Sequence, residues 1–340
     1  MSQPISFDRP GDPIYHTIVL RHVVELPVLG VTVRYESNSA AALQAVEQAF
    51  GVWRGLLQDP ELIDSGQVRV RLIVHEGAEG EMPHAPVTWR LPDPHRLLIH
   101  TPGSVGLMDM RARDAVVYTT PALLADRAHF EYAVLHTMTI PLVDTYERYP
   151  VHAALIARGS VGLLLAGPAG TGKSTIAFEA HRHGLRVLSD DVAHIQLHPR
   201  FRVWGELPGQ VYLTPRARAR FPELAGRVQT LVANGVEKAF VQFPYAWSGP
   251  EGGAPMASQV GVCLLERNGG RASLAPAASS EIEAFLSQGV GIARVMFGDG
   301  MEEAIARVAA GGGWRLSLSD DPADAIPFLD AIFTALEQRD

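Results

Sequence analysis

Hydrophobic and polar positions alternate with a period of two near the start of the chain and then change to a helical spacing. Over 17–37, Val, Ile and Thr stand in near-alternation with polar residues and are interrupted by Pro27 and Gly30, which predicts two strands joined by a turn. Over 39–57 the apolar residues recur three and four positions apart, and Ser39 precedes them as an N-cap residue. This spacing predicts an amphipathic helix.

Shorter apolar segments follow, separated by stretches rich in Gly and Pro. Their patterns predict strands at 67–76, 87–91, 96–100 and 115–119 and a helix at 121–144, with loops at 1–13 and 77–86. These elements define an N-terminal α/β domain over residues 1–145. Its histidines lack the spacing of metal ligands, and it has no dense polar cluster. From its position alone we assign this domain to substrate recognition.

The pattern changes at about residue 146, where a second domain over 146–340 begins. Residues 151–197 read as strand, turn, strand, glycine-rich loop, helix and strand. Further strands are predicted at 240–247 and 260–266, a loop at 249–255 and a closing amphipathic helix at 321–338. The predicted fold class is therefore α/β, with a small α/β domain before a larger one.

The glycine-rich loop, GPAGTGKST at 167–175, fits the Walker A pattern of a P-loop. It follows the apolar strand 161–166 and opens a helix, which is the context in which backbone N–H groups and the helix N-terminus hold phosphate oxygens. Lys173 is placed to reach the β- and γ-phosphates, and Ser174 offers a hydroxyl to Mg²⁺. The predicted cofactor-binding residues, for ATP with Mg²⁺, are Gly167, Ala169, Gly170, Thr171, Gly172, Lys173, Ser174 and Thr175.

Two adjacent carboxylates follow the next predicted strand, 185–189. Because the carboxyl ends of parallel strands lie at one edge of a sheet, Asp190 and Asp191 are expected at the crevice that holds the phosphate loop. Neighbouring strand residues point to opposite sides, so the two carboxylates are expected to have different tasks. One would hold Mg²⁺, and the other would orient or deprotonate an acceptor hydroxyl.

In order, the chain has a His-Ala pair before a strand, a Gly-containing turn, a strand entering a Walker A loop, a helix ending in Gly, and then Ser-Asp-Asp. The order of these features resembles HPr kinase/phosphorylase. The resemblance covers 151–197 and extends to the wider set of HPr-kinase-like serine kinases, whose fold is that of phosphoenolpyruvate carboxykinase. It implies that His152 lies near the phosphates and that Lys173 serves ATP. It further implies that Asp190, with Ser174, is the metal ligand and that Asp191 is the base toward a serine hydroxyl.

The chain also departs from that family. Bifunctional members have Glu after Gly-Lys-Ser, where this chain has Thr175. They also carry a downstream glutamate followed by an arginine, whereas Glu206 here has no Arg directly after it. Arg216, Arg218 and Lys238 are the candidates to supply the positive charge of the family's arginine. These departures favour a kinase without phosphorylase activity.

Composition and charge limit the classes of partner, the disulfide chemistry and the cellular location that we expect. The formal net charge of -8 gives no basic excess for a nucleic-acid backbone, and a single cysteine, Cys263, excludes an internal disulfide. The N-terminus shows no secretory pattern, and no apolar run reaches the roughly 20 residues of a membrane span, so we expect a cytoplasmic protein. The ring assemblies of the family make a homo-oligomer an expectation to test.

The predicted function is that of an enzyme, an ATP- and Mg²⁺-dependent kinase that phosphorylates a hydroxyl, most simply a serine of a protein or peptide. Two alternatives stay open from the sequence. One is a nucleotide-binding regulatory protein without phosphotransfer, and the other is a kinase of a small hydroxyl metabolite.

Overall fold

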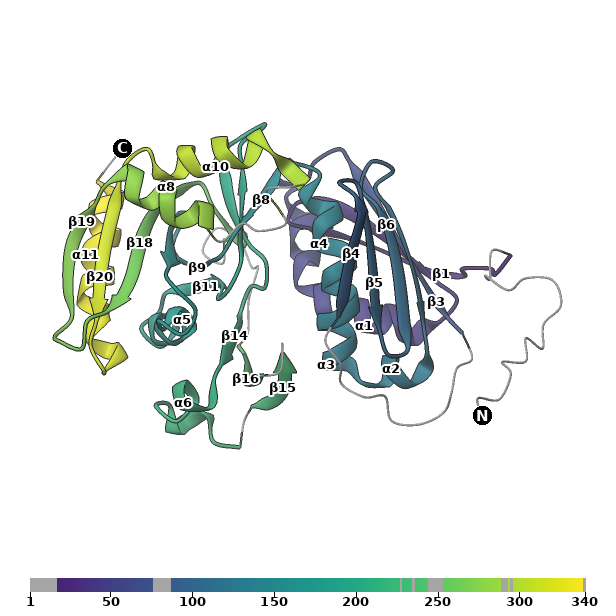
Figure 1. Cartoon of the computed structure of the whole chain (residues 1–340), viewed down its shortest axis with the longest axis horizontal. Coiled ribbons are helices and arrows are strands. Elements are labelled where there is room, and N and C mark those ends of the chain that lie inside the picture. The colour runs from purple at the N-terminus through teal and green to yellow at the C-terminus, as the bar shows by residue number, and fades with distance from the viewer. Residues whose placement is uncertain are drawn as a thin grey trace.

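The structure is a computed structural model that describes residues 17–75, 87–226, 228–233, 236–243, 253–288, 293 and 296–338. It is a mixed α/β protein, and among the described residues the strands form four sheets (Figure 1). Two of these sheets combine parallel and antiparallel pairs, and two are antiparallel throughout.

The first sheet has seven strands and is formed by the N-terminal part of the chain. In spatial order its strands are β1 (His22–Val28), β2 (Val31–Ser37), β3 (Gln67–Val74), β7 (Asp114–Thr119), β6 (Ser104–Asp109), β5 (Arg96–Thr101) and β4 (Thr88–Asp93). Helices pack on one face of this sheet: α1 (Ala40–Phe50), α2 (Pro121–Ala125), α3 (Arg127–Phe130) and α4 (Thr137–Asp144).

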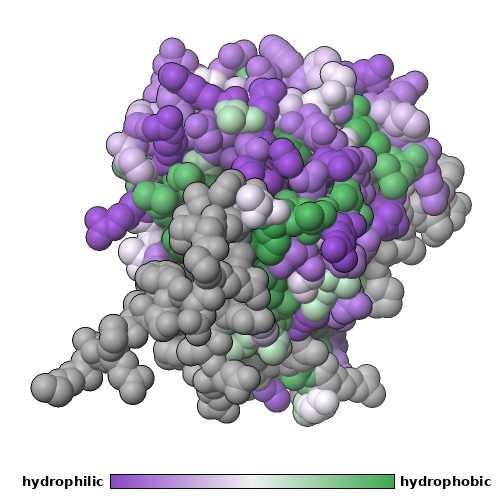
Figure 2. All heavy atoms as spheres, turned by 90° about the vertical axis from the view of Figure 1, so that its right-hand side faces the viewer, coloured by the Kyte–Doolittle hydropathy of each residue, from purple (hydrophilic) through white to green (hydrophobic). Residues whose placement is uncertain are grey.

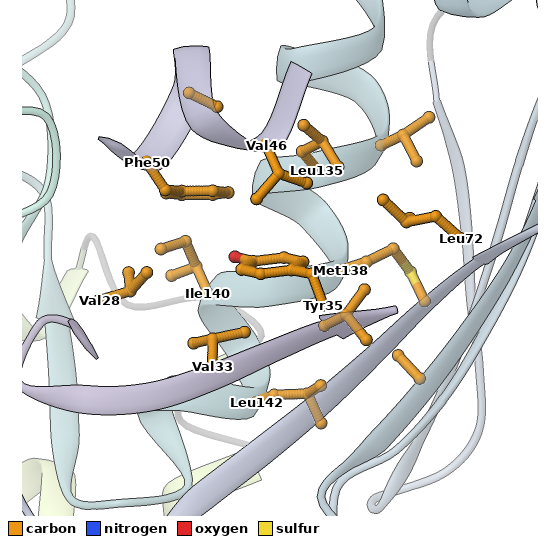
Figure 3. Close-up of a cluster of buried hydrophobic side chains, with 14 of the residues drawn as sticks. Val28, Val33, Tyr35, Val46, Phe50, Leu72, Leu135, Met138, Ile140 and Leu142 are labelled. Atoms are coloured by element: carbon orange, nitrogen blue, oxygen red, sulfur yellow. The ribbon is translucent and has the colours of Figure 1, made fainter. Parts of the chain in front are cut away.

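The core under these helices follows from the alternation of the strands. Val33 and Tyr35 point from β2 toward Phe50 of α1 and Met138 of α4 (Figure 3). The Tyr35 hydroxyl is hydrogen-bonded to Thr139 Oγ1 at 3.1 Å, so this buried polar group is satisfied.

The opposite face of the sheet is mixed in character. Figure 2 shows this side of the molecule, where hydrophilic side chains cover much of the surface and hydrophobic ones show between them. Ion pairs such as Arg69 Nη2 to Glu36 Oε2, at 2.6 Å, lie on it, and Val105 and Leu107 of β6 are exposed. Val105 and Leu107 stand on the same face of β6, and Leu107 lies opposite Leu98 of β5.

The second sheet has six strands and is buried on both faces. Its order is β11 (Arg186–Ser189), β9 (Ala153–Arg158), β10 (Val161–Ala166), β18 (Gln259–Arg267), β20 (Gly313–Leu318) and β19 (Ser273–Ala277). Leu163 and Leu165 of β10 pack on α5 (Lys173–Arg182) and α11 (Ile326–Glu337). Leu164 packs on the other side, against α8 (Ser279–Gln288) and α10 (Asp299–Ala309). A continuous apolar strand is therefore needed here rather than an alternating one.

Two small antiparallel sheets complete the fold. One contains β8 (Arg148–Val151), β12 (Ala193–Gln196), β13 (Arg202–Gly205) and β17 (Met256–Ala257). The other contains β14 (Gln210–Leu213), β16 (Val236–Gln242) and β15 (Gln229–Ala233) and lies beside the short helix α6 (Pro215–Arg218).

Two side chains from residues after 145 are buried against the N-terminal part of the chain. Arg148 is fully buried, where its Nε donates to the Leu29 carbonyl at 3.0 Å and its Nη2 to Asp64 Oδ2 at 2.8 Å. Trp204 is also fully buried and belongs to the N-terminal core, with its ring centroid 6.2 Å from that of Trp53. The division into domains at 145 and 146 stays a prediction, but the packing across it is extensive.

Several sequence predictions need correction. The helix predicted over 39–57 ends at Phe50, because the chain tightens at Gly51 into a 3₁₀ segment, Gly51–Gln58, that buries Trp53. The strands that were not predicted are β6, β8, β12, β13, β14, β15, β17, β19 and β20.

The helix predicted over 121–144 is divided into α2, α3, a π-helical turn (Glu131–His136) and α4. The Asp126 carboxylate accepts from the His129 N–H and begins a new helix there, and Pro141 removes a donor inside α4. Of the predicted loops, 1–13 and 77–86 lie outside the described residues, as does most of 249–255. Within the part of the chain that is described, no helix is both long and apolar enough to cross a membrane.

Candidate functional site

The strand directions bring the predicted site residues to one edge of the second sheet. β10, β11, β18 and β20 all end at this edge, while β9 is antiparallel to its neighbours and begins there. The phosphate loop follows β10, Asp190 and Asp191 follow β11, and His152 stands directly before β9. The topology therefore gathers residues from three separate positions in the chain.

The phosphate loop leads directly into α5, as the motif requires. Lys173 is buried, and its Nζ donates to the Gly167 carbonyl at 2.7 Å. Burial lowers the pKa of Lys173, while Asp191 and Asp190 act in the opposite direction. The ammonium group is thus held across the loop that it closes.

Two glycines of the loop are required by geometry. Gly172, which precedes α5, has φ +125°, a backbone conformation that side-chain-bearing residues rarely adopt. A Cβ atom at Gly167 would lie 2.9 Å from the Leu265 carbonyl oxygen of β18, closer than such contacts occur. These positions explain why the motif needs Gly at its first and sixth places.

Asp190 is buried next to the first turn of α5. Its Oδ2 accepts from the Tyr212 N–H of β14 at 2.7 Å. Burial raises the pKa of Asp190 to about 7, against the lowering effects of the Tyr212 N–H and of the nearby Ser174 side chain. Asp190 and Ser174 therefore place two oxygen groups side by side at the phosphate loop.

Asp191 has different surroundings from Asp190. Its side chain is 60% exposed, and its Oδ1 lies 3.2 Å from Nδ1 of His152. Burial lowers the pKa of His152, with Asp191 opposing and Lys173 adding to that effect. An imidazole that is neutral at physiological pH can orient a carboxylate without neutralising it.

Of the three candidates for the family's missing arginine, Lys238 on β16 is the one that lies near the site. It lowers the pKa of both His152 and Lys173, and it lowers that of Asp190, by its positive charge. Strand alternation places Lys238 on the same face as Phe240, whose ring packs against Tyr212 at 5.3 Å. Arg216 and Arg218 lie in α6 instead.

Glu206, the expected downstream glutamate, belongs to a buried chain of charged groups that joins both halves of the protein. His194 of β12 lies between two carboxylates, with Nδ1 2.8 Å from Asp144 Oδ1 and Nε2 3.2 Å from Glu206 Oε2. His136 Nδ1 lies 3.5 Å from the other Glu206 oxygen. We call these four residues, Asp144, His194, Glu206 and His136, the buried charge chain.

The charge states within the buried charge chain follow from its contacts. Burial lowers the pKa of His194, but Asp144 and Glu206 outweigh that effect and raise the pKa to about 9. Burial raises the pKa of Asp144 to about 6 despite the nearby His194. Burial also acts to raise the pKa of Glu206, but its two histidine partners lower it to about 2. At neutral pH His194 is therefore a cation between two anions.

Two contacts of the site were not foreseen from the sequence. The backbone N–H of Tyr212 holds Asp190, and a backbone donor leaves no signal in residue type. The Arg267 guanidinium, at the end of β18, donates from Nε to the Thr171 carbonyl of the phosphate loop at 2.8 Å. The contact of Arg267 had a signal in the sequence, because Arg267 is a cation at the end of a predicted strand.

The oxygen groups of the site suit Mg²⁺ bound together with phosphates. Mg²⁺ is typically held by one or two carboxylates and by substrate phosphates rather than by a full protein cage. Ser174 and Asp190 supply such a partial set, and the glycine-rich turn before α5 is the kind of backbone that receives phosphate oxygens. Among the described residues, no three His, Cys, Asp or Glu side chains are grouped to hold a metal alone.

Comparisons with known proteins give only a distant likeness. No protein-family model matches the chain, and no curated protein matches it. Among solved structures, the chain is similar to the HPr(Ser) kinase/phosphatase from Coxiella burnetii at 11% sequence identity and a TM-score of 0.29. The match covers 56% of this chain and 99% of that one. No activity follows from a likeness of this size.

Proposed function

We propose that this protein is an ATP- and Mg²⁺-dependent kinase of the HPr-kinase-like type, which transfers the γ-phosphoryl group to a hydroxyl of a protein or peptide serine. The observation that carries the proposal is the pairing at one sheet edge of a phosphate loop with two unlike carboxylates. Asp190 is buried against Ser174, and Asp191 is open to solvent beside His152. A site that only bound nucleotide would not need the exposed carboxylate of Asp191 with its partner His152.

Each side chain has a task in this reaction. The phosphate loop and Lys173 bind and align the triphosphate, and Ser174 with Asp190 would hold Mg²⁺, which neutralises charge on the phosphate oxygens when bound. Asp191 takes the proton from the acceptor hydroxyl, and His152 orients its carboxylate. The acceptor oxygen forms a bond to the γ-phosphorus, the bond to the β–γ bridging oxygen breaks, and ADP is released.

Two variants separate binding from transfer. Lys173→Met should lose nucleotide affinity, because it removes the cation that reaches the phosphates. Asp191→Asn should bind Mg²⁺-ATP as the wild type does but transfer phosphate about 10²–10⁴-fold more slowly, since it lacks the base. Affinity is measured by calorimetry, and transfer from γ-labelled ATP to proteins and peptides of an extract of the source cells.

The control for Asp191→Asn is Asp330→Asn. Asp330 lies on α11, and its side chain is exposed to the same extent, 60%. The control should retain both binding and transfer. Binding without any labelled product in the wild type would instead support the nucleotide-binding regulatory protein. Label confined to small molecules would support the metabolite kinase.

A further inference from the structure

Arg267 connects the phosphate loop to the neighbouring strand ends. Its Nε donates to the Thr171 carbonyl at 2.8 Å, and its Nη1 donates to the Ser319 carbonyl after β20 at 3.0 Å. Its Nη2 lies 3.3 Å from the place that a Cβ atom of Gly172 would occupy. The guanidinium group is therefore packed directly against the Thr171–Gly172 peptide.

The bond to Thr171 determines which way this peptide faces. In a trans peptide the C=O and the following N–H point in opposite directions. Holding the Thr171 carbonyl toward Arg267 thus turns the Gly172 N–H away from β18 and β20. Gly172, at φ +125°, has no side chain to resist rotation of this peptide, so the orientation depends on an external partner.

The other bonds of Thr171 do not orient its carbonyl group. The Thr171 N–H and hydroxyl are both engaged by the Pro168 carbonyl, at 3.2 and 2.8 Å, and neither of these bonds orients the Thr171 carbonyl. Asp320 lies 3.9 Å from Arg267 Nη1, but its side chain is 96% exposed, so it neutralises little of the charge.

We propose that Arg267 is a positioning residue of the phosphate site: it fixes the Thr171–Gly172 peptide so that the Gly172 N–H faces a bound phosphate. Arg267 acts through the loop rather than on the substrate. The inference rests on phosphate binding by the loop, as the proposed function requires, and it assigns a task to a residue outside the motif.

Calorimetric titration of three ligands tests this role. The ligands are Mg²⁺-ATP, inorganic tripolyphosphate and adenosine, and the variants are Arg267→Met, Arg267→Lys and Arg315→Met. Arg267→Met should weaken ATP and tripolyphosphate to the same degree, by roughly tenfold for one misdirected phosphate bond. Arg267→Lys should recover part of this affinity, because an ammonium group can still donate to one carbonyl. Arg315→Met is the control, since Arg315 on β20 is 40% exposed against 38% for Arg267 and pairs with Glu266 and Glu281.

The outcomes are distinct. Wild-type affinity for tripolyphosphate in Arg267→Met would overturn the inference. So would an equal loss in Arg315→Met, or a loss for ATP that spares tripolyphosphate. If Arg267→Met does not fold, the Lys variant decides: the role requires a partial loss of tripolyphosphate affinity in Arg267→Lys that Arg315→Met does not share, and wild-type affinity in Arg267→Lys counts against the role. Failure of the wild-type protein to bind tripolyphosphate would contradict the proposed function itself.

Discussion

The charge of His194 is open to a direct test by the substitution His194→Gln. Glutamine keeps a polar side chain of similar reach but removes the cation that lies between Asp144 and Glu206. Both carboxylates are buried, so neither can recover its hydration when the cation is lost. We expect the variant to be markedly less stable than the wild type at neutral pH.

Two lines of reasoning give the size of the effect. The pKa of His194 rises from 6.5 to about 9 on folding, which corresponds to roughly 3 kcal/mol of unfolding free energy. Removing one partner of a buried ion pair costs about 3–5 kcal/mol. The pKa-based contribution is complete only below pH 6.5 and has fallen to about 2 kcal/mol at pH 7.5, so we expect the free energy of unfolding to fall by about 2–4 kcal/mol at that pH.

Urea denaturation followed by circular dichroism measures this loss. His100→Gln, at an exposed position of the first sheet, is the control and should leave the midpoint unchanged within error. The double variant Asp144→Asn with His194→Gln should lose less than the sum of the two single changes, because it removes the stranded anion together with the cation.

The pH dependence provides the refutation. A histidine whose folded pKa is raised contributes stability that is complete below the unfolded pKa of 6.5 and is lost as the pH rises through about 9. The difference between wild type and His194→Gln should therefore shrink from pH 7.5 to pH 9.5, a range above the pKa of Asp144, about 6. A loss under about 1 kcal/mol at pH 7.5, or a difference that grows toward pH 9.5, would refute the assigned charges.

Two further predictions concern the strand ends of the site. The folded pKa of Asp190 is raised to about 7, so its burial destabilises the fold increasingly as the pH rises from about 4 to 7. The stability of Asp190→Asn relative to the wild type should therefore increase across that range and stay constant above it. Urea denaturation without metal measures this difference. An unchanged difference would contradict the burial of an ionisable group there. Gly205→Ala should cost about 3 kcal/mol or more, because a Cβ atom would overlap the Leu188 carbonyl of β11. Gly270→Ala, where the nearest atom to a new Cβ is 3.4 Å away, should cost far less, and equal melting temperatures would contradict the close approach.

Local residue patterns were sufficient for the elements that carry the phosphate loop. The apolar run of β10, the glycines and the Lys-Ser pair form a signal within a few residues, because the backbone chemistry of such a loop is itself local. The N-terminal helices were harder to predict. The π-helical turn at 131–136 and the 3₁₀ segment at 51–58 depend on how side chains pack on the sheet, which hydrophobic spacing does not record.

Contacts between the N-terminal part of the chain and the residues after 145 were not predicted. Glu206 stands in the region where the resembled family has a downstream glutamate, and the fold places it beside His194 and His136. No spacing in the sequence relates residues 136 and 206, since their contact exists only once β13 and the N-terminal helices are assembled. The roles of Asp190, Asp191 and His152 stay predictions, although their positions at one sheet edge follow from the topology.

Trp204 has a consequence for how this protein can be engineered or can diverge. Because its indole lies in the N-terminal core beside Trp53, exchanging the chain before residue 146 for a foreign segment would leave the Trp204 side chain without the residues that bury it. Arg148 would at the same time lose the Leu29 carbonyl and Asp64. A chimera that transplants residues 17–145 therefore has to carry Trp204 and Arg148 with them.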